Sequence, residues 1–138
     1  MTNNLKTKGQ LEALISEAII QFEKDYMGRG PKEAKTYLVD NLVIIKLQGV
    51  LTPSEKQLAN SAESDSGRDL IKKMRHALLQ KGRYLLEALI KDLLGVSIKS
   101  LHSDLSTITG ERMIIFSLEE VPEVVALHEA KSLRENEK

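Results

Sequence analysis

The chain has 138 residues, of which 41% are hydrophobic, so it is long enough to bury one substantial core. Lys and Arg together number 20, as do Asp and Glu, and this balance gives no general attraction to nucleic acid or to an acidic membrane surface. The absence of cysteine excludes disulfides, thiolate catalysis and cysteine-ligated zinc. Only 4% of the residues are aromatic, which argues against the stacking surfaces of single-strand nucleic-acid binders.

The domain organisation follows from the same numbers. We predict a single domain over residues 1–138, with an ordered core from about residue 8 to about residue 128. The first ten residues lack the apolar core of a signal peptide, and no apolar run approaches the roughly 20 residues that a membrane span needs. We therefore expect a soluble, cytoplasmic protein that does not itself insert into a membrane.

The first predicted element is an amphipathic helix over residues 11–26, with Thr7 and Gln10 forming a capping box at its start. The side facing the core is expected to carry the apolar residues Leu11, Leu14, Ile15, Ala18, Ile19, Phe22 and Tyr26. The side facing solvent is expected to carry the charged residues Glu12, Glu17, Glu23 and Lys24.

The segment Met27-Gly-Arg-Gly-Pro-Lys32 ends this helix and concentrates residues with special backbone properties. Gly28 and Gly30 flank Arg29, and Lys32 adds a second cation. The segment can be a simple connection between a helix and a strand, or it can present backbone N–H groups and two cations to a phosphate or carboxylate. It follows a helix and lacks the eight-residue phosphate-loop signature, so the motif alone is weak evidence for nucleotide binding.

Two short strands are predicted next, over residues 35–39 and 42–47, with Asp40 and Asn41 as the turn of a hairpin. One long strand is the alternative. The continuous apolar run at residues 42–45 indicates a central strand that is covered on both faces. Helices can cover one face, and either helices or a second subunit must cover the other, so we expect a homodimer.

A short helix is predicted from Pro53 to about Ser61. Thr52 is suited to cap it, Pro53 fits the first helical position, and Glu55 completes a capping box. Because capping accounts for Thr52 and Glu55 fully, we assign them no chemical role.

A long amphipathic helix over residues 69–94 organises the rest of the chain. It is expected to follow a turn at residues 62–67, to be capped by Ser66 and to end at Gly95. At 1.5 Å per residue it is roughly 40 Å long, more than a small sheet needs, so part of its apolar stripe can serve a second surface. The predicted buried stripe contains Ile71, Met74, Leu78, Leu85, Leu89 and Leu93, widened by Leu79, Leu86 and Ile90.

The exposed side of the first half of this helix is predicted to be basic, with Lys72, Lys73, Arg75, His76, Lys81 and Arg83. A basic face can be merely solvated, can dock an acidic partner or can follow a phosphate backbone. The low aromatic content and the zero net charge argue against nucleic acid as the partner.

A second hairpin is predicted from strands over residues 96–103 and 113–118, with a turn at 106–110 and a bulge near Ser100. A weak helix and a frayed tail should follow. His102 and Asp104 share one face of the first strand and could pair or share a metal. The remaining histidines do not complete a metal site, so no metal and no cofactor is expected.

These elements predict an α+β fold in which two hairpins form a small, mainly antiparallel sheet backed by helices, one of them long and central. Two classes of function remain open. The first is a homodimeric accessory protein that uses residues 28–32 and the exposed face of the long helix for a partner. The second is an anion- or nucleotide-binding protein in which Arg29, Lys32 and Arg75 hold the ligand. No nucleophile can be paired with a base by spacing, so an enzyme is not expected.

Several short motifs, taken in chain order, resemble a bacterial family. They are Gly28-Arg-Gly-Pro31, the strand end at Gly49 with Leu51, Thr52 and Glu55, then Arg75, Gly95-Val96 and Phe116-Ser-Leu-Glu119. Their order over roughly residues 10–120 resembles the MpsC-like family, named after a subunit of a sodium-translocating, membrane-potential-generating system. The resemblance implies a soluble cytoplasmic accessory protein linked to ion or inorganic-carbon uptake through a membrane-protein partner. It carries over no catalytic residues.

Overall fold

The computed structural model describes residues 6–60 and 64–136. These ranges contain, in chain order, α1 (Lys8–Met27), β1 (Glu33–Val39), β2 (Leu42–Gln48), α2 (Pro53–Ala59), α3 (Ser64–Leu94), β3 (Ile98–Leu105), β4 (Arg112–Leu118) and α4 (Glu123–Asn136). The two hairpins, β1–β2 and β3–β4, lie in one antiparallel sheet. The predicted α+β class and the predicted order of elements are therefore confirmed.

The strand order in the sheet is β1-β2-β4-β3, so the two central strands come from different hairpins. Ile44 of β2 pairs with Ile115 of β4, and both strands are richly apolar. The first hairpin turns at Asp40 and Asn41, and Asp40 takes the positive φ, 51°, that this residue type tolerates. A register shift between Ile98 and Ser100 confirms the bulge predicted near Ser100.

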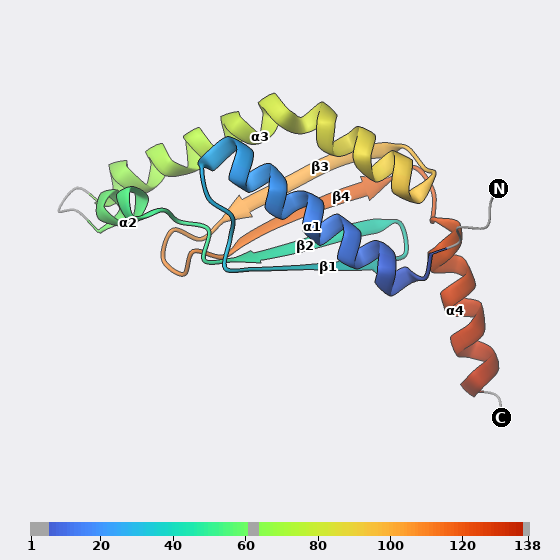
Figure 1. The fold of residues 1–138 in the computed structure, drawn as a ribbon. Coiled ribbons are helices and arrows are strands. Elements are labelled where there is room, and N and C mark those ends of the chain that lie inside the picture. The colour runs from blue at the N-terminus through green and yellow to red at the C-terminus, as the bar shows by residue number, and fades with distance from the viewer. Residues whose placement is uncertain (1–5, 61–63, 137–138) are drawn as a thin grey trace.

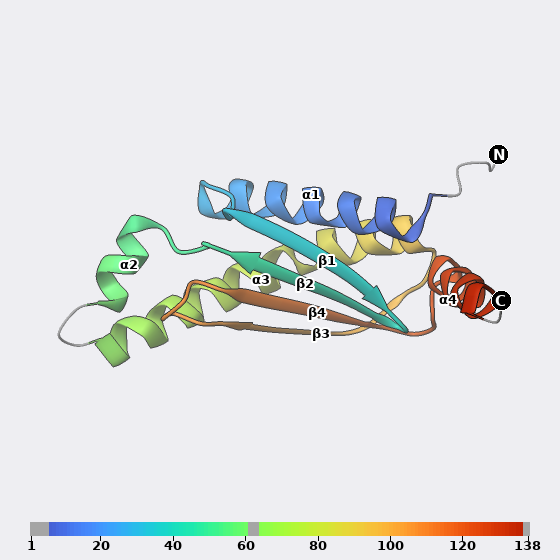
Figure 2. The same ribbon diagram turned by 90° about the horizontal axis from the view of Figure 1, so that it is seen from below.

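The helices α1 and α3 lie on the same side of the sheet, as Figures 1 and 2 show from two directions. Side chains on this side of the sheet are fully buried, for example Val43, Ile45, Ile114 and Phe116. They meet Ile15 and Ile19 of α1 and Leu79, Leu86 and Ile90 of α3 in one core. The other face of the sheet carries no helix from the described part of the chain.

The first two predicted helix starts are confirmed by their caps. In α1 the Gln10 amide N–H donates to Thr7 Oγ1 at 3.1 Å, and the Thr7 amide N–H donates to Gln10 Oε1 at 2.9 Å. Thr52 and Glu55 form the same reciprocal pair at the start of α2, with Pro53 at the first helical position. Local sequence is sufficient here because a capping box involves only residues three apart.

The start of α3 differs from the prediction. Its helix begins at Ser64, so Ser66 lies inside the first turn and is not the cap. Residues 64–67 are helical, whereas a turn was predicted there; residues 61–63 lie outside the described ranges. Gly67 lies so close to α2 that an added Cβ would be 2.3 Å from the Leu58 carbonyl oxygen. Close packing against α2 therefore explains this glycine, which the prediction had taken as a turn residue.

The buried stripe of α3 is also rotated from the predicted one. Met74 and Leu85 were predicted to be buried but are 40% and 48% exposed. The most buried positions are Ile71, Arg75, Leu79, Gly82, Leu86 and Ile90, which follow the helical period closely. The prediction failed because it excluded Arg75 and Gly82 as non-apolar, and this moved the predicted stripe to one side.

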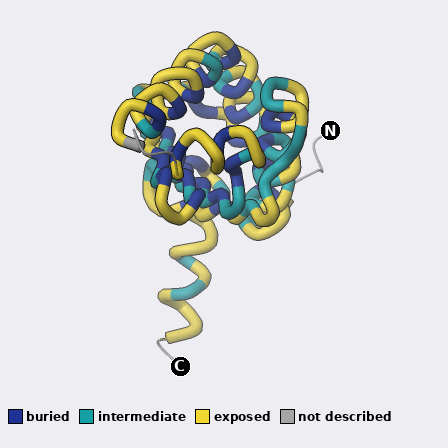
Figure 3. Tube along the Cα trace, turned by 90° about the vertical axis from the view of Figure 1, so that its left-hand side faces the viewer, coloured by how far each residue is buried: buried dark blue, intermediate teal, exposed yellow. Residues whose placement is uncertain are grey.

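The terminal helix α4 projects from the body of the molecule, as Figure 3 shows. Val125 is its buried anchor at 1% exposure, while Leu127 and Leu133 are 55% and 65% exposed. The helix extends to Asn136, so the tail predicted to be frayed is helical as far as that residue; residues 137 and 138 lie outside the described ranges.

Candidate functional site

The glycine-rich segment after α1 takes its special conformation at Gly28. Gly28 has φ 84°, and its N–H donates to the Lys24 carbonyl at 2.9 Å, which ends the helix. Gly30 is not among the glycines with positive φ, and an added Cβ there would lie 3.3 Å from Ile20 Cγ2. The segment is thus a helix cap followed by a close approach to α1.

The two cations of this segment lie at the end of β2. Arg29 Nη2 donates to the Gly49 carbonyl at 3.2 Å, and the Lys32 amide donates to the Gln48 carbonyl at 2.8 Å. The Lys32 side chain lies across Gly49, because a Cβ added to Gly49 would be 2.7 Å from Lys32 Cγ. Arg29 and Lys32 are therefore brought together around Gly49, whereas Arg75 is buried in the core and donates to the next carbonyl along the chain, that of Val50.

Arg75 is the largest fully buried side chain, with 2% exposure. Its Nη1 donates to Glu23 Oε1 at 2.8 Å, and its Nε donates to Glu55 Oε2 at 2.9 Å. Its Nη2 donates to Glu55 Oε1 at 2.7 Å and to the Val50 carbonyl at 2.6 Å. Every guanidinium nitrogen has a protein acceptor, and the geometry towards Glu55 is bidentate.

The positions of Arg75 and Glu23 correct two predictions. Both were assigned to solvent-facing sides of their helices, but each is 2% exposed. The assignment failed because charge alone was used to place them. Ile15, Ile19 and Glu23 follow one another at four-residue steps, as do Ile71, Arg75 and Leu79, so the core period itself was the signal.

A fourth charge, Arg112 of β4, was not singled out from the sequence. It is 3% exposed, and its Nη1 lies 3.5 Å from Glu23 Oε2, while its Nη2 lies 3.4 Å from the Arg75 carbonyl oxygen. The signal was again the period, since buried residues alternate along β4 as Arg112, Ile114, Phe116 and Leu118. We call Glu23, Glu55, Arg75 and Arg112 the buried charge cluster.

Burial and pairing act against each other in the buried charge cluster. Burial by itself would raise the pKa of Glu55, but hydrogen bonds from Arg75 and from the Thr52 backbone outweigh it, so this pKa lies below its ordinary value of 4.5. Burial likewise opposes the charge of Arg75, but its hydrogen bond to Glu55 raises its pKa. The pKa of Arg112 is lowered by burial, which its longer contacts do not offset. Within the described residues Arg112 Nε has no partner.

The buried charge cluster joins α1, α2, α3 and β4. Apart from Arg112 Nε, its charged groups are hydrogen-bonded to one another or to neighbouring backbone, and both carboxylates are engaged by arginine, so neither is placed as a free acid or base for a reaction. Its chemistry is that of a structural ion network, in which each charge is tolerated because an opposite charge compensates it.

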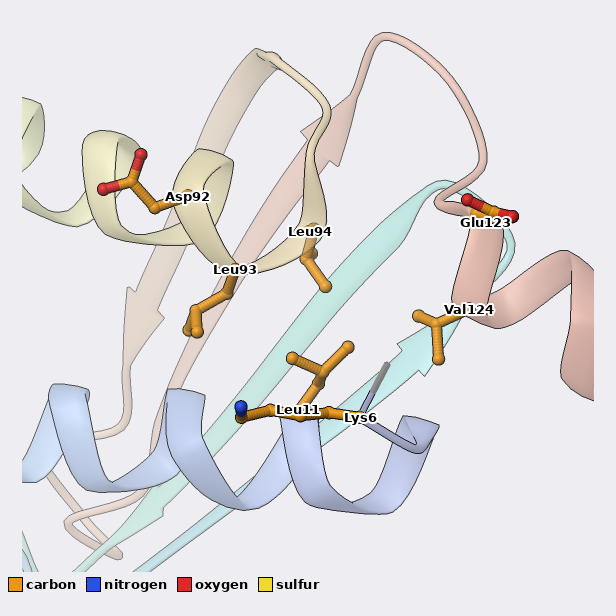
Figure 4. Close-up of a pocket in the computed structure, with 7 residues that line it drawn as sticks. All are labelled: Lys6, Leu11, Asp92, Leu93, Leu94, Glu123 and Val124. Atoms are coloured by element: carbon orange, nitrogen blue, oxygen red, sulfur yellow. The ribbon is translucent and has the colours of Figure 1, made fainter. Parts of the chain in front are cut away.

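Two other groups of polar residues in the described ranges are not arranged as a catalytic or metal site. His102 contacts Ser100 at 3.1 Å and Asp104 lies 3.7 Å from Lys72 Nζ, so the two do not pair with each other. No group of three His, Cys, Asp or Glu residues in the described ranges is placed to hold a metal. In the pocket of Figure 4, Asp92 of α3 and Glu123 of α4 lie far apart around an apolar floor that includes Leu11 and Leu94.

The open face of the sheet is the face that carries no helix. Strand register places Tyr37, Ile44, Ile115 and His102 in one row across it. The neighbouring row is Lys35, Lys46, Met113 and Asp104. The third row is Val39, Leu42, Ser117 and Ser100. The middle of this face therefore carries the apolar residues Leu42, Ile44, Met113 and Ile115 together with Lys46 and Ser117, while one edge carries Lys35 and the other carries Asp104.

Comparison with known proteins gives consistent matches. The family model described as "Na+-translocating membrane potential-generating system (MpsC)" matches residues 7–120. The uncharacterised protein YbcI of Bacillus subtilis (strain 168) is 42% identical over 113 residues, which are 82% of this chain and 89% of YbcI. The uncharacterised protein YrhF of the same organism is 28% identical over 93 residues, covering 66% of this chain and 73% of YrhF. No solved structure shows significant similarity.

Proposed function

The chain belongs to the MpsC family, and we propose that it is a non-catalytic, homodimeric accessory protein of a membrane ion-transport system. The family description supplies the link to a sodium-translocating system. None of the helices in the described ranges has the length and apolar character needed to cross a membrane. A contribution to transport would accordingly run through a membrane partner.

The main support for a dimer is the exposure of apolar residues on the open face of the sheet. Tyr37 and Val39 are 40% and 47% exposed, and the central residues Ile44 and Ile115 are only partly covered. A sheet whose two central strands are apolar on both faces gains from a second layer on its open side. The proposal is that a second copy of the chain supplies this layer.

The charges on the open face fit a second copy. Consider a two-fold axis that runs parallel to the strands, between β2 and β4. It would place each row of the second copy over the same row of the first, with the order of the residues reversed. Ile44 would then face Ile115 of the second copy, and Lys35 would face Asp104. The face would thus be complementary to itself where Ile44 meets Ile115 and where Lys35 meets Asp104, while Lys46 would lie over Met113 and Asp104 would keep its own Lys72 at 3.7 Å.

Light scattering coupled to size exclusion tests the dimer directly. The wild-type chain should elute at twice its monomer mass of 15.4 kDa. Ile115→Glu should give a folded monomer because it would bury an unpaired charge against the second copy. Leu133→Glu, at an exposed position on α4, is the matched control and should remain a dimer. A wild-type monomer at micromolar concentration, or a dimeric Ile115→Glu variant, would contradict this interface.

The accessory role is tested in a bacterium that carries this gene. Deletion should lower the membrane potential that cells maintain in sodium-containing medium, and the wild-type gene should restore it. The Ile115→Glu gene should restore it less well if the dimer is the working form. An unchanged membrane potential in the deletion strain would rule out the accessory role without affecting the dimer.

A further inference from the structure

A polar pocket lies where α2, the end of β2 and the β3–β4 turn meet. Its volume is about 230 Å³, and the polar side chains around it are Lys32, Lys56, Asn60, Thr107 and Thr109. No carboxylate lines it within the described ranges. The pocket is separate from both the open face of the sheet and the buried charge cluster.

The two lysines give this pocket an uncompensated positive charge. Among the described residues neither Lys32 nor Lys56 forms an ion pair. By contrast, Lys72 lines another pocket but already has Asp104 at 3.7 Å. Two lysines without an ion pair that line one concave site favour an anion over a metal cation.

Thr107 adds an unused hydrogen-bonding group to the pocket wall. The residue is only 9% exposed, yet no partner for its hydroxyl is present in the described part of the chain. Thr107 Oγ1 is not among the buried side-chain atoms that lack a partner in the described residues, so this hydroxyl is in contact with solvent and is available to hydrogen-bond a ligand in the pocket.

Two glycines with positive φ shape the backbone beside the pocket. Gly49 and Gly110 both have positive φ, 65° and 77°, and the Val50 N–H donates to the Gly110 carbonyl at 3.2 Å. This bond ties the two loops together, and the stem of Lys32 lies over Gly49. The ammonium group of Lys32 is therefore carried by a constrained stem beside the loop that holds Thr107.

We propose that this pocket binds a small oxyanion of the phosphate class. Lys32 and Lys56 would neutralise its charge, while the Thr107 hydroxyl and the Asn60 amide would supply neutral hydrogen bonds. The volume lies below the range of roughly 300–1,000 Å³ typical of pockets for larger organic ligands, which favours a compact anion. Lys32 was among the anion-binding residues predicted from sequence, whereas Arg29 reaches the pocket wall only through the Gly49 carbonyl.

Titration of the full-length protein with inorganic phosphate at constant ionic strength, followed by amide NMR, tests the proposal. The amide signals of Gly49, Thr107 and Gly110 should shift and saturate. Lys32→Gln and Lys56→Gln should each raise the Kd for phosphate roughly tenfold, as the loss of one charge-assisted hydrogen bond does. Thr107→Val, which keeps the side-chain shape, should also weaken binding without lowering the melting temperature.

Control variants distinguish specific binding in the pocket from non-specific electrostatic attraction of phosphate to the protein surface. Lys73→Gln removes an exposed lysine of α3 outside the pocket and should leave the Kd unchanged. A parallel titration with AMP distinguishes a free anion from a phosphate group carried by a larger molecule, according to which binds more tightly. The proposal is overturned if neither ligand saturates the signals, or if saturation persists unchanged in the Lys32→Gln/Lys56→Gln double variant. These outcomes do not depend on the oligomeric state.

Discussion

At the scale of single residues, the buried charge cluster is the feature that most constrains this fold. Arg75 reaches three separate segments: α1 through Glu23, α2 through Glu55 and the end of β2 through the Val50 carbonyl. A buried ion network contributes little net stability compared with an apolar core, but the loss of one partner leaves the others charged and unpaired. We therefore expect the cluster to determine how the segments meet rather than how tightly they are held.

Arg75→Ala should be severely destabilising. It leaves the Glu23 and Glu55 carboxylates buried without their cation, and the expected loss of unfolding free energy is about 3–5 kcal/mol. Urea unfolding measures this loss. Lys73→Ala, two residues away on the exposed side of α3, should change the free energy by less than about 0.5 kcal/mol. Equal effects of the two substitutions would refute a special role for Arg75.

The lowered pKa of Glu55 predicts how the stability of the protein changes at acidic pH. In the unfolded chain this carboxyl titrates near 4.5, whereas in the native protein it stays ionised to lower pH. Because the unfolded state binds the proton first, the contribution of Glu55 is complete above about pH 4.5 and is lost as pH falls below that value.

The measurement compares wild type with Glu55→Gln in urea unfolding across pH. The stability advantage of the wild type should be constant from neutral pH down to about pH 5 and should then shrink on further acidification. Glu17→Gln, an exposed carboxylate of α1, should show no such pH-dependent difference. An advantage that grows below pH 4.5 would mean that the direction of the pKa shift is wrong.

At the scale of elements, the crossing of α1 and α3 depends on a glycine inside a helix. A Cβ added to Gly82 would lie 2.3 Å from Phe22 Cε2 and 3.1 Å from Tyr26 Cζ. These two rings are stacked, with centroids 4.4 Å apart. Gly82, which interrupts the apolar stripe in the sequence, is thus the position where α3 receives the aromatic pair of α1.

Gly82→Ala should lower the melting temperature. In an exposed helix the change would stabilise by about 1 kcal/mol, but here overpacking should cost about 1–3 kcal/mol. Gly9→Ala is the matched control, since nothing lies within 4 Å of an added Cβ in the first turn of α1. Thermal unfolding should show opposite signs for the two changes. A higher melting temperature for Gly82→Ala would show that the helices cross differently.

At the scale of the whole molecule, the fold is a two-layer structure with helices on one side of a sheet. The helices α1 and α3 bury one face of the sheet (Figure 2), and the middle of the other face, with Ile44 and Ile115 only partly covered, is left for a second layer. The proposed dimer supplies that layer, while the proposed oxyanion pocket lies at the end of the molecule near α2. The two surfaces do not overlap, so each can be tested without disturbing the other.

A charge exchange tests the proposed two-fold arrangement of the dimer. Lys35→Glu and Asp104→Lys should each raise the dimer Kd, roughly fivefold to tenfold, because like charges would then face each other at two equivalent places. The double variant restores opposite charges and should recover most of the wild-type Kd in sedimentation equilibrium. Additive weakening in the double variant would exclude this axis, even if the protein is a dimer.

The elements with local causes could be predicted from the amino-acid sequence. The capping boxes at Thr7 and Thr52, the Asp40 turn and the bulge near Ser100 were all predicted, because each involves residues only a few positions apart. Apolar periodicity likewise located both hairpins and the long helix, and so predicted the α+β class. The family was also recognisable, because its short motifs occur in the expected order.

Contacts between residues far apart in the chain could not be predicted in this way and became known from the folded structure. Glu23 and Arg112 are 89 positions apart, and nothing local to either one indicates that they share a cluster with Arg75. The same holds for the pocket that unites Lys32 with Lys56 and Thr107, and for the pairing of β2 with β4. Periodicity shows that a position is buried, but the partner that makes a buried charge tolerable is supplied by folding alone.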